Sequence, residues 1–434
     1  VYQAVEANSL GLSEAQPLQT REEGMNAMLA GNLLLLVEGY DKGLKIGSKG
    51  YPARSVDNTD TEKVLRGSNE GFTESVKTNT ALIRKRIRST DMKVEELTAG
   101  VRSNTRLVLV YMKELVYPEV LEQIRRGIDQ FVIDGVLDSG IIEQLTEEDW
   151  VSPFPQFQTT ERPDLAAMEV LDGRVVLLCD NSPVALLLPS VFQDFMNVTE
   201  DRYNRFEIAS FERVIRYAAM IFSFLLSGTY LAVIGFHTMI LPTNLILSFA
   251  ESRQGVPFPS LLEVLFMELA FELIREAGVR VPGALGNAIG IVGGLIIGDA
   301  AVSANLVSPI VVMIVALTAL GSMVIPDEEF ASAFRLMKYG FLFLGGYLGI
   351  YGIVLGLYLM ISHLSGLLSF GVPYLVPFVR KHPVSRVGDG IWRIPFKKRQ
   401  YRPVYAKSDQ SLRLKHKAQT KAAGKEAENE IRRK

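Results

Sequence analysis

Hydrophobic residues crowd into the second half of the chain. Between Val281 and Pro326 the sequence runs for 46 residues with a single charged side chain, Asp299. The hydrocarbon core of a bilayer is about 30 Å thick, and a helix crosses it in roughly 20 apolar residues. The stretch is therefore long enough for two crossings joined at Gly298–Ala300. This pattern predicts an integral membrane protein.

Residues 205–379 as a whole are expected to form a helical transmembrane domain with about four spans. The first, Tyr217–Phe236, is 20 residues long and uncharged, and it follows an amphipathic stretch, Phe206–Arg216. Residues 237–277 are predicted to be broken and amphipathic, because His237–Ala250 is too short to cross a bilayer. The further predicted spans are Gly283–Gly298, Asn305–Ile325 and Tyr339–Ile361.

The first 204 residues alternate predicted strands and helices, which indicates a soluble α/β region of two small lobes. Residues 1–66 form the first lobe, and because the chain opens in mid-pattern we expect this lobe to be incomplete at its N-terminus. Residues 67–204 contain a long helix, Glu70–Ser89, followed by the second lobe. Its predicted strands include Arg106–Tyr111 and Arg174–Cys179.

Charge is distributed unevenly along the chain. Residues 380–434 carry 17 Lys and Arg against 5 Asp and Glu. The overall net charge of −2 therefore results from this basic end offsetting an acidic remainder of the chain. We expect a basic, partly disordered tail, preceded by a stretch near the membrane interface, Leu364–Val379. Four spans place both ends on one side, and the excess of Lys and Arg beside the outer ends predicts that the N-terminal domain and the tail are cytoplasmic. There the tail would contact anionic lipids.

The sequence contains no motif that indicates an enzyme. It has no P-loop lysine, no nucleophile elbow and no H-E-x-x-H pair. Its four histidines lie too far apart for a metal site, and no cofactor is predicted. The single cysteine, Cys179, excludes an intrachain disulfide and is read as a buried core residue.

Acidic residues within the apolar half are the first candidates for function, because charges inside a membrane are costly and usually functional. The candidate ion pathway comprises Glu263, Glu268, Glu272 and Asp299. Glu268 and Glu272 are four residues apart and share one face of a helix. If that helix lies flat on the membrane the acids form a solvated face, and if it stands in the bundle they form a stripe that attracts cations. Asp299 could equally cap a short loop.

Glycines at every fourth position form a second candidate feature. They lie along one stripe of a predicted span, at Gly286, Gly290, Gly294 and Gly298. Small residues let helix backbones approach closely. The stripe therefore predicts either tight packing between helices of one subunit or a wall of a shared pore.

Several separate motifs, in the same order, resemble the GerA-type spore germinant receptor A subunits, from about residue 20 to 380. The soluble half supplies Gly67–Glu74, Thr78–Ile87, Pro153–Phe157, Thr160–Asp164 and Asp180–Pro183, and the membrane half supplies Met267–Pro282, Gly290–Gly294 and Val307–Pro309. Two positions depart from the family pattern: Ser68-Asn69 replaces Pro followed by Arg or His, and Thr238 replaces Pro after Phe-His. Both a nutrient-receptor subunit and a relative from the spore-maturation operon remain open.

The resemblance implies a multi-pass protein of the inner spore membrane that assembles with a transporter-like B subunit and a lipoprotein C subunit. It implies a homo-oligomeric, ligand-gated channel subunit that conducts monovalent cations and starts germination; no nucleic acid is expected as a partner. On this hypothesis, Glu268→Gln or Glu272→Gln lowers cation flux without abolishing assembly. The alternative is a membrane-anchored scaffold that organises receptor partners without conducting. A secondary transporter is less favoured, because only one broken region is evident.

Overall fold

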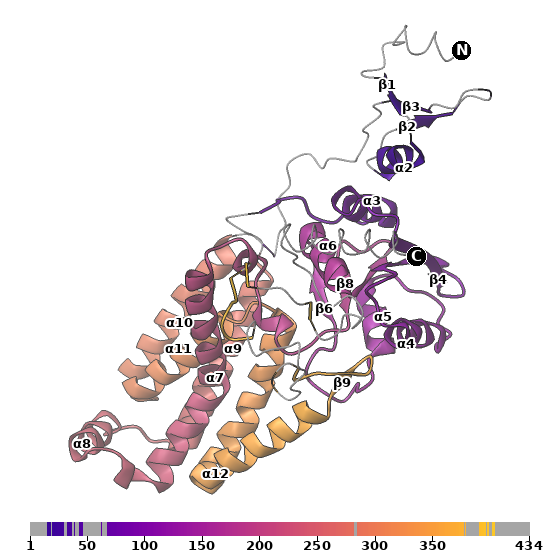
Figure 1. Cartoon of the computed structure of the whole chain (residues 1–434). Coiled ribbons are helices and arrows are strands. Elements are labelled where there is room, and N and C mark those ends of the chain that lie inside the picture. Colours follow the sequence, from indigo (N-terminus) through magenta and orange to yellow (C-terminus); the bar gives the residue numbers. More distant parts are fainter. Residues whose placement is uncertain are drawn as a thin grey trace, which may run out of the picture.

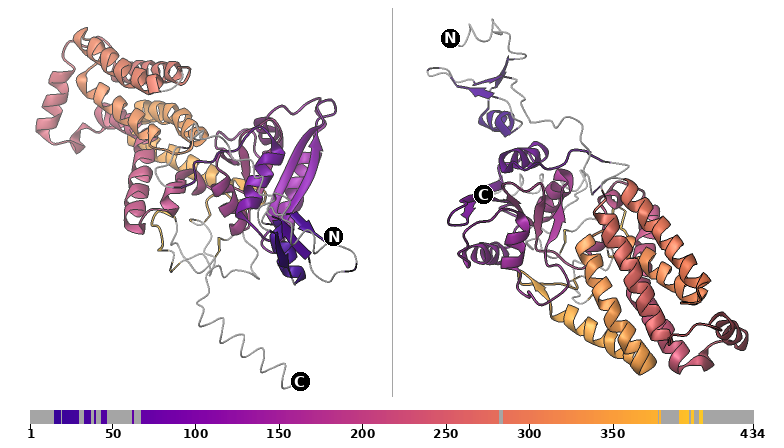
Figure 2. Two further views of the ribbon diagram at one scale, coloured as in Figure 1. Left: turned by 90° about the horizontal axis from the view of Figure 1, so that it is seen from above. Right: turned by 180° about the vertical axis from the view of Figure 1, so that it is seen from behind.

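The computed structural model of the chain describes residues 15–18, 20–29, 33–36, 39, 43–46, 62, 67–281, 284–376, 378, 390–395, 397–398 and 402–403. The expected beginning of the first lobe and most of the predicted basic tail lie outside these residues. The helices α7–α12 gather at one end of the molecule, and the sheets lie at the other (Figure 1, Figure 2).

A small antiparallel sheet opens the described chain. Its strands β1 (Ala15–Leu18), β2 (Leu33–Leu35) and β3 (Gly43–Ile46) lie in the order β1-β3-β2, with helix α2 (Arg21–Leu29) beside them. Leu44 on the central strand is fully buried.

The second sheet has five antiparallel strands in the order β4-β5-β7-β8-β6. The strands are β4 (Met92–Ala99), β5 (Thr105–Met112), β6 (Gln158–Thr160), β7 (Val175–Cys179) and β8 (Ala185–Leu188). Alternate residues point to opposite faces of a strand, and both faces of this sheet are covered. Val108 and Val110 pack under α3 (Val76–Arg86) and α6 (Pro163–Asp172). Leu107 and Leu109 pack under α4 (Pro118–Asp129) and α5 (Ser139–Thr146). The predicted mixed α/β character is confirmed.

Short 3-10 turns η1 (Asp194–Met196) and η2 (Thr199–Arg202) lead from the sheet into the helical part. It comprises α7 (Phe206–Phe236), η3 (Thr238–Ile240), α8 (Thr243–Ser252), α9 (Ser260–Val279), α10 (Ala284–Ser303), α11 (Pro309–Met323) and α12 (Glu328–Gly366). The short α8 lies at the end of the bundle that is farthest from the sheets (Figure 1). By length and composition, α7 and α12 are the described helices that could cross a membrane, and α11 is a shorter apolar helix.

Helix α12 is a hairpin of two arms. Gly349 has φ 64° and ψ −147°, a conformation that only glycine adopts readily. A Cβ atom at Gly352 would overlap the carbonyl oxygen of Leu344, and one at Gly356 would lie 2.8 Å from Cε1 of Phe341. The prediction of one span over Tyr339–Ile361 is therefore wrong, because the chain reverses in its middle.

One further boundary differs from the sequence prediction. Helix α10 continues through Gly298–Ala300 to Ser303, so the predicted joint lies within a helix. After α12, the short strands β9 (Leu368–Ser369) and β10 (Val372–Pro373) form a two-stranded sheet of their own, and Phe370 between them packs in the core of the five-stranded sheet. The expected place of Leu364–Val379 near a membrane interface stays a prediction. Ser369 Oγ accepts a hydrogen bond from the Ser190 amide at 3.1 Å. Burial of such bonded polar groups fixes the end of α12 to the sheet domain.

Candidate functional site

Two of the three predicted acidic residues of α9, Glu263 and Glu268, are buried, and the third, Glu272, is partly exposed. The side chains of Glu263 and Glu268 are 0% exposed, and that of Glu272 is 38% exposed. Glu263 and Glu268 are therefore not part of a solvated face, whereas Glu272 remains accessible to solvent. A buried carboxylate is costly unless cations or hydrogen-bond donors surround it, so each must have partners.

Glu268 binds donors from three other helices. Its carboxylate accepts hydrogen bonds from Ser227 of α7 at 2.6 Å and from Thr318 of α11 at 3.1 Å. Lys338 of α12 forms an ion pair with it at 2.5 Å, and the lysine side chain is only 5% exposed. One carboxylate therefore ties α9 to α7, α11 and α12 at a single point inside the bundle.

Glu263 has a different role, at the start of α11. Its Oε1 accepts a hydrogen bond from the backbone amide of Ser308 at 2.5 Å. Negative charge at a helix N-terminus is stabilised by the unsatisfied amides and the helix dipole. Arg253, which follows α8, lies 3.6 Å from the other carboxylate oxygen. These contacts favour a structural role for Glu263.

A network of ion pairs surrounds Glu272 at the opposite end of α9. Arg335 of α12 contacts Glu272 at 3.3 Å and Glu328 at 3.1 Å. Arg275 also contacts Glu328 at 3.1 Å and donates to Ser322 of α11 at 2.8 Å. This ion-pair network links α9, α11 and the first arm of α12 near the sheet domain.

A cavity of about 770 Å³ lies between α9, α10 and α11. It brings together five of the eight candidate residues: Glu268, Glu272, Gly294, Gly298 and Asp299. Glu263 is not among its lining residues, and the surroundings of Gly286 and Gly290 lie outside the described part of the chain. Lys338 lines the same cavity.

The wall formed by α10 consists of glycines and one acid. A Cβ atom on Gly294 would lie 3.1 Å from Phe271 of α9, and one on Gly298 would lie 3.0 Å from Val312 of α11. These glycines thus permit close packing between helices of one chain. Asp299 is exposed, and within the described residues it has neither an ion pair nor a hydrogen bond to its side chain.

Sequence reasoning missed Lys338, the counter-ion of Glu268. The only available signal was its position as the last charged residue before the uncharged run Tyr339–Ile361. Pairing with an acid 70 positions earlier depends on how α9 and α12 pack, which no local pattern encodes.

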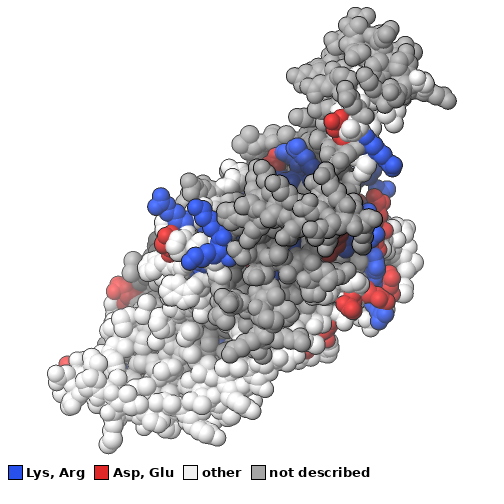
Figure 3. Space-filling view, viewed as in Figure 1, with Lys and Arg blue, Asp and Glu red and all other residues white. Residues whose placement is uncertain are grey.

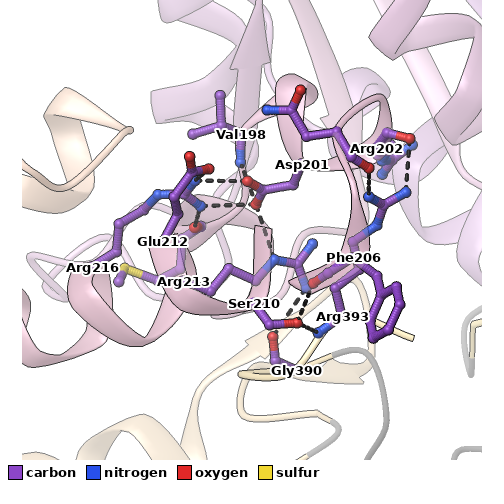
Figure 4. A network of polar contacts seen from close by, with 12 residues as sticks. Val198, Asp201, Arg202, Phe206, Ser210, Glu212, Arg213, Arg216, Gly390 and Arg393 are labelled. Carbon is purple, nitrogen blue, oxygen red and sulfur yellow. Dashed lines mark hydrogen bonds and ion pairs between the residues drawn. The ribbon is translucent and has the colours of Figure 1, made fainter. Parts of the chain in front are cut away.

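A second buried ionic cluster joins α7 to the sheet domain (Figure 4). Asp201, 0% exposed, accepts hydrogen bonds from Arg213 at 2.9 Å and from Arg216 at 2.7 Å. Burial raises the pKa of Asp201, but the hydrogen bonds and charge of Arg216 outweigh this and hold it below its usual value. Arg213 and Arg216 therefore fix the start of α7 and are not free surface charges.

A group of acids meets where α5 approaches the start of α12. Burial, together with the nearby carboxylates of Glu329, Glu147, Asp327 and Asp138, raises the pKa of Glu143 to about 8. Burial likewise raises the pKa of Glu147 to about 7. These carboxyls retain their protons in the folded chain at a pH where exposed glutamates have lost them.

The raised pKa of Glu143 predicts how stability depends on pH. Between about pH 4.5 and about pH 8 the unfolded chain releases this proton and the folded chain keeps it, so the free energy of unfolding falls as pH rises through that window. Glu143→Gln should reduce this fall, which thermal unfolding of the detergent-solubilised chain from mildly acidic to mildly alkaline pH would measure. Glu148→Gln, at an exposed neighbour, is the matched control; equal slopes in both variants would contradict the prediction.

Comparisons with known proteins agree over most of the chain. A family model described as Bacillus/Clostridium GerA spore germination protein matches residues 2–405. "Uncharacterized membrane protein YfkQ" of Bacillus subtilis (strain 168) is 40% identical, covering 85% of this chain and 72% of that protein. "Spore germination protein KA" of the same organism is 37% identical, covering 95% and 75%. "Spore germination protein GerLA" of Bacillus cereus is 37% identical, covering 87% and 77%.

Among solved structures, the crystal structure of the N-terminal domain of the A subunit of the Bacillus megaterium spore germinant receptor GerK3 is 27% identical to this chain. The match covers 44% of this chain and 68% of that one, with a TM-score of 0.34.

Proposed function

The chain belongs to the Bacillus/Clostridium GerA family of spore germination proteins, and on that premise we propose that it is a membrane subunit of a spore germinant receptor that conducts monovalent cations. It would act as a homo-oligomer in the inner membrane of the spore, together with a transporter-like B subunit and a lipoprotein C subunit. Release of cations through it would start germination.

The helical part supports the membrane assignment. Helix α7 and the hairpin α12 are apolar enough to cross a bilayer, and a relative is named as a membrane protein. In the view of Figure 3 the far end of the bundle is almost free of charged side chains, and basic side chains gather near the sheet domain. A hydrocarbon environment favours such an uncharged helical surface.

The directions of the helices support the proposal that both ends of the helical part lie on the same side of the membrane. Six helical segments run along the bundle: α7, α9, α10, α11 and the two arms of α12. An even number of such segments returns the chain to the end of the bundle where it entered, whether or not each one crosses the bilayer. Arg205, Lys397 and Lys398 lie near that side, and the positive-inside rule then favours a cytoplasmic sheet domain and tail.

One observation carries the conduction proposal: Glu268, Glu272 and Asp299 line one cavity within the helical part. Acidic linings attract cations in cation channels. Lys338 neutralises Glu268 and Arg335 neutralises Glu272, which leaves Asp299 as the acid that has no partner within the described residues. Asp299 is therefore the residue whose charge a passing cation would meet directly.

Potassium flux into proteoliposomes tests the proposal, with the chain reconstituted alone and with the B and C subunits of its receptor. We expect Asp299→Asn to lower flux roughly fivefold, since a unit charge about 4 Å from a cation contributes about 1 kcal/mol in water-like surroundings. Neutralising an exposed side chain that has no bonded partner should leave folding unchanged.

Glu276→Gln is the matched control for the flux measurement. Glu276 is also an acid of the helical part, but its side chain is 63% exposed, it pairs with Arg280, and it does not line the cavity. Equal flux in the Asp299 and Glu276 variants would exclude the cavity as the pathway. Absence of flux from folded, oligomeric chain with all partners present would favour the scaffold, which the complete pairing of Glu268 with Lys338 also allows.

A further inference from the structure

A segment beyond the hairpin, of which residues 390–395 and 397–398 are described, is held against the beginning of α7. The amide of Arg393 donates to Ser210 Oγ at 3.1 Å, and the guanidinium donates to the Arg202 carbonyl at 2.8 Å. Arg213 donates to the carbonyl of Gly390 at 3.2 Å. These contacts lie beside the buried Asp201 cluster (Figure 4). The backbone of the segment is thus fixed at one level of α7.

Beside these anchored residues the segment presents an apolar and basic surface. Trp392 is 65% exposed, although its neighbour Arg393 is only 8% exposed. Ile391 is also exposed, and Lys397 and Lys398 follow as exposed cations. An exposed indole next to lysines is the composition found where proteins meet the headgroup layer of a membrane, because indole has both an apolar body and a polar N–H.

The level at which the segment is held is close to that layer. Ser210 lies seven positions before Tyr217, where the uncharged part of α7 begins, and this corresponds to about 10 Å along the helix. Headgroups extend about 5–8 Å beyond the hydrocarbon on each side. The Ser210 contact would therefore lie about 2–5 Å beyond the outer edge of the headgroups, close enough for the exposed side chain of Trp392 and the following lysines to reach them.

We propose that residues 390–395 and 397–398 bind the anionic phospholipid surface, with Trp392 among the headgroups and Lys397 and Lys398 facing lipid phosphates. This inference rests on the proposed membrane position of the helical part. Anionic lipid is the favoured binding partner because its phosphates carry the charge opposite to that of the two lysines. These lysines belong to the strongly basic end of the chain. Each such cation near an anionic surface attracts the segment to it. The contact would hold the sheet domain at a fixed height above the bilayer.

The chain has two tryptophans, Trp150 and Trp392, so Trp150→Phe leaves Trp392 as the only indole. This variant of the full chain would be reconstituted in phosphatidylcholine–phosphatidylglycerol vesicles containing lipids brominated near either the headgroup end or the methyl end of the acyl chain. We expect Trp392 emission to be quenched, and more strongly by shallow bromine than by deep bromine.

A reference indole separates failure of this inference from failure of the proposed function. Phe222→Trp, combined with Trp150→Phe and Trp392→Phe, places the only indole on an exposed position of α7 within the uncharged stretch. If this indole is quenched and Trp392 is not, the segment is covered by protein or water and the inference is wrong. If neither is quenched, the membrane position itself is wrong.

Charge reversal tests the lysines. Lys397→Glu with Lys398→Glu should weaken the quenching of Trp392 in vesicles that contain phosphatidylglycerol and bring it to the value seen in phosphatidylcholine alone. Lys93→Glu with Lys113→Glu makes the same charge change at exposed positions of the five-stranded sheet. An equal loss in the two double variants, or no loss in the first, would contradict binding of the lysines to lipid phosphates.

Discussion

Replacing Gly345 by alanine is expected to prevent the first arm of α12 from packing on α7. A Cβ atom at Gly345 would overlap the carbonyl oxygen of Gly228, which belongs to the helix backbone of α7. A Cβ atom at Gly228 would likewise lie 2.5 Å from the carbonyl oxygen of Phe341. Rotation of a side chain cannot relieve contacts with backbone, so the helices must separate, and we expect a cost of about 3 kcal/mol or more.

Gly340→Ala provides the matched control, five residues earlier in the same arm. No atom lies within 4 Å of a Cβ placed at Gly340. In this open position alanine should stabilise the helix by up to about 1 kcal/mol, because it restricts the unfolded chain. Thermal stability in detergent, followed by size-exclusion chromatography, would compare the two variants. Equal stability would mean that α7 and α12 do not meet at Gly345.

Glycines do allow helices of this chain to approach closely, but the closest approaches are not at the glycines that the sequence pattern indicated. The four-residue spacing from Gly286 to Gly298 on α10 predicted either tight helix packing or a pore wall. Among the described glycines, the closest approaches to backbone lie instead around α7, at Gly321 of α11 and Gly345 of α12, and inside the α12 hairpin at Gly352. Spacing reveals that glycines share a stripe, but it does not reveal whether a partner backbone lies opposite.

The elements of the sheet domain could be predicted locally, whereas the reversal of α12 could not. The apolar run 107–111 and the turn at Asp180–Pro183 mark strands by composition alone. Gly349 lies in an uncharged run that contains several other glycines, and only one of them reverses the chain. The choice depends on packing against Phe236 at the end of α7 and His237 directly after it, which lie next to that glycine.

The residues of the candidate site could be predicted from the sequence, but their ion-pair and hydrogen-bond partners could not. The rarity of charge in the apolar half pointed to the acids of α9 and to Asp299 before any fold was known. Their environments separate them: Glu263 caps α11, Glu268 is paired with Lys338, and Asp299 has no partner in the described chain. Only the packing of four helices establishes these differences.

Replacing Glu268 by glutamine is therefore expected to destabilise the bundle, in contrast to the flux-only effect expected from sequence. The substitution leaves the ammonium of Lys338, 5% exposed, without its counter-ion. Breaking a buried ion pair by removal of one partner costs about 3–5 kcal/mol, because the remaining charge stays in a low-dielectric interior. Thermal unfolding of the variant in detergent would show the loss, and any change in cation flux would then have a structural cause.

The double variant Glu268→Gln with Lys338→Met should recover most of this stability. Glutamine can still bond to Ser227 and Thr318, and methionine fills the lysine position without a charge. A thermodynamic cycle over the two single variants and the double variant isolates the coupling between the residues. Strong coupling would establish a dry, neutral pair that closes the cavity at this point. Negligible coupling would mean that water reaches Glu268, and the pathway would then include this carboxylate along with Asp299.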